Sequence, residues 1–156
     1  GDAGPVADAI LGGWTVAGIG TLTTGRPVNL SVQGNPSNTG GPDRPDVVSD
    51  WKLSGSERNL NRWFNAAAFV RNQAFAFGNA GRNLILGPGS VNFDFSLYKQ
   101  FSIRERLRFQ FRAEAFNATN TPQFGVPNTQ VGNPTYGVIT TAERPRNLQL
   151  GLKALF

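Results

Sequence analysis

Three stretches of the chain alternate between apolar and polar side chains, a pattern typical of β-strands with two different faces. Successive side chains of a strand point to opposite sides, so the alternation places one kind of side chain on each face. The clearest alternating stretches are residues 91–101, 106–116 and 148–156, and further candidate strands are 14–24, 28–33 and 138–142. We therefore expect an all-β fold built as an antiparallel meander, with a hairpin between 91–101 and 106–116.

The connections between these strands differ greatly in length. Residues 34–90 and 117–137 are rich in Gly, Asn, Pro and Thr and predict long loops, whereas residues 102–105 form a short turn. Short turns at one end of a sheet and long loops at the other are typical of bacterial outer-membrane barrels. The two hairpin strands also reach the ~9–11 residues that a tilted strand needs to cross a bilayer. A soluble sandwich has the same alternation, so the pattern alone leaves both classes open.

Composition excludes several kinds of chemistry. The chain of 156 residues has no Cys and no His, which rules out disulfides, thiolate catalysis and imidazole ligands or bases. Acidic residues are few and scattered, and no glycine-rich phosphate loop is present. The net charge of +5 reflects a shortage of acids and includes no basic run, so nucleic-acid binding is not indicated. We expect a protein that is not an enzyme, with no metal site, no cofactor and no nucleic-acid partner.

A series of motifs runs through nearly the whole chain. It includes GWTVAGI at 13–19, RWFNAAAF at 62–69, RFQFRAEAFN at 108–117, and the segments 24–28, 44–46, 78–83, 87–89, 92–99 and 148–156. The series resembles the C-terminal barrel of TonB-dependent outer-membrane receptors, in particular the Oar-like group with a carboxypeptidase-regulatory-like domain. This resemblance implies a cell-surface location in the bacterial outer membrane and energised uptake of an oligosaccharide, a peptide or a metal chelate. The partners implied are membrane lipid, the rest of the receptor barrel and its plug, and the barrel-assembly machinery.

We interpret residues 1–156 as a single C-terminal barrel segment. A plugged lumen needs many more strands than this length provides, and neither a plug nor an energy-coupling box is found in the sequence. The chain is therefore expected to be a partial barrel, that is, a fragment or a piece that assembles with copies of itself.

The phenylalanine-bearing side of the strands is expected to face the membrane or another chain. Its aromatic residues are Phe93, Phe95, Phe109, Phe111 and Phe156. Such a face, with open strand edges beside it, favours association, so we do not expect a free soluble monomer. Lys99 interrupts this side near the end of its strand, where a long side chain can reach water.

The opposite side carries the candidate ligand-binding residues. They are Asp94, Tyr98, Arg108, Arg112 and Glu114. These side chains could bind a ligand in a lumen, or form a ladder of charges between neighbouring strands. In the long loop, Trp63 is a candidate stacking platform or a part of the packing of the loop.

Two further functions remain open at this point. The chain could be a self-assembling β-rich protein that forms filaments or another structure at the cell surface. It could also be a secreted β-sandwich that binds carbohydrate.

Overall fold

The chain folds into two compact units, each built from segments that are distant in the sequence. The computed structural model describes residues 11–104 and 107–156. The sheet unit contains Val91–Pro122, Arg144–Phe156 and the N-terminal segment that ends at Leu22. The loop unit contains Thr23–Ser90 and Gln123–Glu143.

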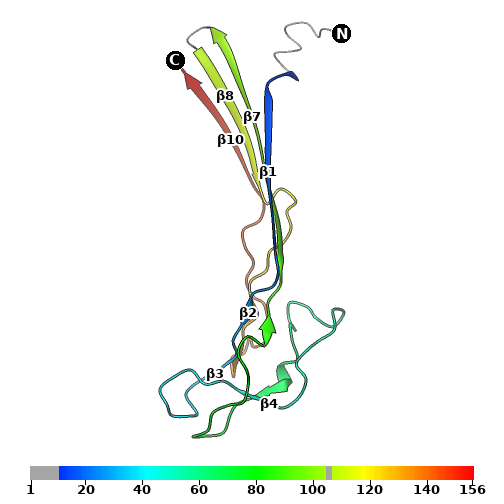
Figure 1. Ribbon diagram of the computed structural model, residues 1–156, viewed down its shortest axis with the longest axis vertical. Coiled ribbons are helices and arrows are strands. Elements are labelled where there is room, and N and C mark those ends of the chain that lie inside the picture. The colour runs from blue at the N-terminus through cyan, green and yellow to red at the C-terminus, as the bar shows by residue number, and fades with distance from the viewer. Residues whose placement is uncertain (1–10, 105–106) are drawn as a thin grey trace. The chain divides into compact units, whose positions relative to one another are not determined.

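The long alternating stretches form a single four-stranded sheet. Its strands, in spatial order, are β1 (Trp14–Thr23), β7 (Ser90–Arg104), β8 (Leu107–Phe116) and β10 (Asn147–Leu155) (Figure 1). β8 pairs antiparallel with both β7 and β10. The predicted hairpin between 91–101 and 106–116 is therefore confirmed, as is the all-β antiparallel fold.

The loop unit contains short strand pairs. β2 (Pro27–Val28) pairs with β6 (Ile85–Leu86), β3 (Ser31–Val32) with β9 (Gln130–Val131), and β4 (Asp46–Val47) with β5 (Phe69–Val70). A single 3₁₀ turn, η1 (Ala66–Ala68), precedes β5. No helix in the part of the chain that the structure describes is long and apolar enough to cross a membrane.

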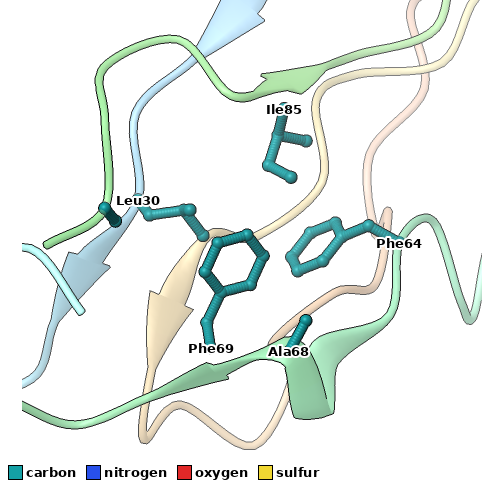
Figure 2. Packing of buried hydrophobic residues seen from close by; sticks show 6 residues of the cluster. Leu30, Phe64, Ala68, Phe69 and Ile85 are labelled. Carbon is teal, nitrogen blue, oxygen red and sulfur yellow. The ribbon is translucent and has the colours of Figure 1, made fainter. Parts of the chain in front are cut away.

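A small hydrophobic core holds the loop unit together. It consists of Leu30, Phe64, Ala68, Phe69, Ala80 and Ile85 (Figure 2). The rings of Phe64 and Phe69 meet edge to face with their centres 5.9 Å apart, a favourable aromatic geometry. Residues that the sequence assigns to a long loop thus bury apolar side chains in a common core, which explains how so long a connection can be ordered.

Asp43 fixes the glycine-rich part of this unit. Its carboxylate accepts hydrogen bonds from the backbone N–H of Ser37, at 2.7 Å, and from the Ser37 hydroxyl. These bonds favour the charged form, so they lower the pKa of Asp43 below its ordinary value. The carbonyl oxygen of Asp43 accepts a further bond from the N–H of Val32, which joins this turn to β3.

Two of the predicted strands differ from the observed ones. Residues 28–33 do not form one strand, because Leu30 turns into the core between β2 and β3. The predicted strand at 138–142 is wrong: the segment has only an isolated bridge from Ala142 to Phe124. The reason is that the N–H of Ile139 donates to the carbonyl of Leu60 and is not available to a strand partner.

Replacing Phe64 by Ala is expected to destabilise the loop unit by about 3–5 kcal/mol, because the change leaves a cavity in the core. Hydrogen–deuterium exchange of peptides from the loop unit will measure this as a loss of protection. Phe77→Ala is the matched control, since that ring is 75% exposed. Equal loss of protection in both variants would contradict the assignment of the core.

The loop unit is also expected to lose stability in acid. Because the pKa of Asp43 is lower in the folded state than its ordinary 3.8, its stabilising effect is complete above that value and is lost as the pH falls through the folded value. Exchange protection of Asp43→Asn should therefore fall less than that of the parent between about pH 5 and pH 2. Asp50→Asn, a change at an exposed carboxylate of the same unit, is the control; if it abolishes the acid sensitivity instead, the role of Asp43 is wrong.

Candidate functional site

The register of the sheet collects the apolar side chains on one side. Phe95 and Leu148 both lie opposite Ala115, and directly paired residues share a face. We call this side the apolar face. Its members on β7, β8 and β10 include Phe93, Phe95, Leu97, Phe101, Phe109, Phe111, Ala113, Ala115, Leu148, Leu150, Leu152 and Ala154. Phe93 is 43% exposed and Leu150 75%. So large an exposed apolar surface is unusual for a soluble protein.

An aromatic cluster surrounds Lys99 on the apolar face. The Lys99 ammonium lies 5.1 Å from the ring centre of Trp14, and Trp14 meets Phe111 edge to face at 6.1 Å. Phe101 stacks on Phe109 with ring centres 5.7 Å apart. The expectation that Lys99 reaches water is therefore wrong. Lys99 is only 7% exposed, and the ring of Trp14, from a strand distant in sequence, lies over its ammonium and stabilises its charge.

The predicted charged residues lie on the other side of the sheet, here called the polar face. Arg112 lies opposite Tyr98, Arg108 lies opposite Ser102, and Glu114 lies opposite Ser96. Arg112 and Glu114 form an ion pair, with 2.7 Å between Nη2 and Oε1. The predicted ladder of charges between strands is wrong for this pair, because the two residues are neighbours on the same strand and their partners across the sheet are neutral.

Asp94 has a structural role on this face. Its carboxylate accepts hydrogen bonds from the backbone N–H of Asn117, at 2.9 Å, and from the side-chain amide of Asn92, at 3.0 Å. Asn117 follows the end of β8 with a φ of 50°, a left-handed conformation that asparagine tolerates. A shallow hollow of about 180 Å³ opens beside Asp94 and Glu114. Asp94 already accepts these bonds and Glu114 is paired with Arg112, so both carboxylates beside the hollow have partners within the sheet.

Trp63 belongs to the loop unit and lines a separate pocket. The pocket has a volume of about 250 Å³ and is lined by Trp51, Lys52, Leu53, Arg58, Trp63, Phe64, Leu84, Ile85 and Leu86. The indole N–H of Trp63 donates to the carbonyl of Leu86 at 2.7 Å, which fixes the ring. The Arg58 guanidinium lies over the same ring, 5.1 Å from its centre. We call this cavity the loop pocket.

The structure thus divides the predicted ligand residues between two sites. Asp94, Tyr98, Arg108, Arg112 and Glu114 share the polar face, whereas Trp63 lies in the loop pocket. Sequence reasoning missed Lys52 and Arg58, which follow no periodic pattern. The only local signal is that Lys52 directly follows a tryptophan. Within the described ranges, no cluster of acidic residues is arranged to hold a metal ion.

Comparison with known families decides the class of protein. A family model described as an outer membrane beta barrel domain matches residues 1–149. The chain belongs to this family. Membership confirms the expected location of this outer membrane barrel protein in the bacterial outer membrane. No curated protein and no solved structure matches the chain.

For a barrel protein, we expect the apolar face to contact lipid and the polar face to contact water. The chain has no cysteine, so a single spin label can be placed at Leu150→Cys or at Gln149→Cys without any background. In the protein reconstituted into lipid vesicles, a label at 150 should collide mainly with oxygen, and one at 149 mainly with a water-soluble nickel chelate. Power-saturation EPR measures both accessibilities. Equal values at the two positions would show that the faces are not assigned correctly.

Proposed function

We propose that this protein is part of the barrel wall of a TonB-dependent receptor of the Oar-like kind, which takes up a nutrient with energy supplied through the cell envelope. The observation that carries this proposal is the sheet with one apolar face and two open edges. Among the described strands, β1 pairs only with β7 and β10 only with β8. In a closed barrel neither strand would be an edge, so in the proposed receptor further strands would continue the wall on both sides.

The loop unit supports capture of a substrate rather than passive diffusion. Its core holds Phe64 and Phe69 in fixed positions, and Trp63 is held by its bond to Leu86. Binding groups on loops act best when a rigid scaffold positions them. A passive pore requires a polar lumen but no ordered ligand pocket, so an ordered loop unit fits a receptor better.

The proposed partners follow from the same surfaces. Lipid would cover the apolar face, and the rest of the barrel and its plug would complete the wall and fill the lumen. The barrel-assembly machinery would act on β10, whose edge is open. Phe156, which follows β10, is 99% exposed and would be available to that machinery or to a neighbouring strand.

The open edges also favour a second candidate, a self-assembling surface protein in which copies pair β1 with β10. Every residue of both strands is exposed. The secreted carbohydrate-binding sandwich, in contrast, is at odds with membership in an outer-membrane family. A single cysteine at Lys153→Cys distinguishes the first two candidates, since extensive cross-linking between copies is expected only for self-assembly.

Uptake by the parent bacterium provides the test of the transport function. A strain that lacks the gene should lose uptake of one radiolabelled nutrient class among an oligosaccharide, a peptide and a ferric chelate. A protonophore should abolish the same uptake in the parent strain, because transport through a TonB-dependent receptor requires the proton gradient. Uptake that is independent of the gene, or that persists with the protonophore, would overturn the proposal.

A further inference from the structure

The loop pocket has two aromatic walls that are held in place before any ligand binds. Trp63 is fixed by its hydrogen bond to the carbonyl of Leu86, and Trp51 packs against Phe69 with ring centres 5.8 Å apart. Phe64 and Ile85, both buried, also line the pocket. A flat ring entering this pocket would meet rigid apolar surfaces, so little conformational entropy would be lost on binding.

The charged side chains that line the pocket are both positive. Lys52 and Arg58 are the charged residues among those that line it. The acids nearest in sequence are engaged with other groups: the Asp50 carboxylate accepts a bond from the backbone N–H of Lys52 at 3.0 Å, and the Glu57 carboxylate accepts bonds from the N–H and the hydroxyl of Ser54, at 3.1 and 2.7 Å. Within the described part of the chain, neither cation lies within ion-pair distance of a carboxylate. Two cations beside an apolar wall therefore remain available to an anion.

We infer that the loop pocket binds a small aromatic carboxylate. The carboxylate would pair with Arg58, whose planar guanidinium matches two carboxylate oxygens, and with the ammonium of Lys52. The ring would pack against the tryptophans, beside the Arg58 guanidinium that lies over Trp63. The volume of about 250 Å³ lies below the ~300–1,000 Å³ of sites for drug-sized ligands, which points to a ligand with one ring.

An aromatic ring fits this pocket better than a sugar ring. A sugar acid needs several hydrogen-bond partners for its hydroxyl groups, and buried polar groups without partners weaken binding. The side chains that line the pocket are mostly apolar, and the indole N–H of Trp63 is already bonded. That the pocket captures a nutrient for transport rests on the proposed function, whereas the binding itself does not.

Isothermal titration calorimetry of the full chain in detergent micelles tests this assignment with benzoate, its neutral isostere benzamide, and galacturonate. Benzoate should bind most tightly. Arg58→Gln should weaken benzoate binding about tenfold or more, as expected for the loss of a charge-assisted hydrogen bond. Arg82→Gln is the matched control, because Arg82 is an exposed arginine of the same unit outside the pocket, and it should leave binding unchanged.

Each other result overturns part of the inference. Absence of benzoate binding, or equal binding of benzamide, would exclude a carboxylate site. Equal weakening by Arg58→Gln and Arg82→Gln would place the site elsewhere. Tighter binding of galacturonate would overturn the aromatic assignment in favour of a sugar acid. The calorimetric result is independent of the uptake assay. Benzoate binding without energised uptake would reject the transport function alone. Energised uptake without benzoate binding would reject only the assignment of a carboxylate ligand to the loop pocket.

Discussion

The hydrogen-bonding requirement of a strand edge governs the rest of this structure. Inside a bilayer no water is available to backbone N–H and C=O groups, so a sheet in lipid must continue until its edges meet. The four-stranded sheet has an apolar side suited to lipid, but among the described strands β1 and β10 have no partner at the outer edges. We therefore expect the sheet unit to be stable in a membrane only with neighbouring strands, which in the proposed receptor belong to the rest of the barrel wall.

The loop unit meets a different requirement, because it must be ordered without a regular sheet. Its strand pairs are very short and contribute few backbone bonds. Burial of Phe64, Phe69 and Ile85 supplies the apolar contacts, and the carboxylate of Asp43 holds a turn of glycines that would otherwise be flexible. The sheet unit thus depends on its surroundings for stability, whereas the loop unit carries its own core.

The fold could be predicted from the sequence where the alternation of apolar and polar residues extends over a long stretch. Alternation over 91–101 and 106–116 predicted the hairpin and assigned Arg112 and Glu114 to one face, because side chains two apart must share a side. It failed at 138–142, where the backbone bonds to a distant loop rather than to a strand. The contacts of Trp63 with Arg58 and Leu86 could not be predicted either, because loop packing brings these residues together and no sequence periodicity relates them. The burial of Lys99 was not predicted either, because its aromatic partner, Trp14, lies on another strand.

The distribution of charge assigns the two surfaces different roles. On the polar face, Arg112 and Glu114 form an ion pair and Asp94 bonds the backbone that follows β8, so these three charged groups already have partners within the sheet. In the loop pocket, two cations lie beside fixed aromatic rings with no carboxylate among the lining residues. Discrimination between ligands requires groups that only the correct ligand can satisfy. In the proposed receptor, we therefore expect the loop unit to provide ligand selectivity and the sheet to form part of the wall.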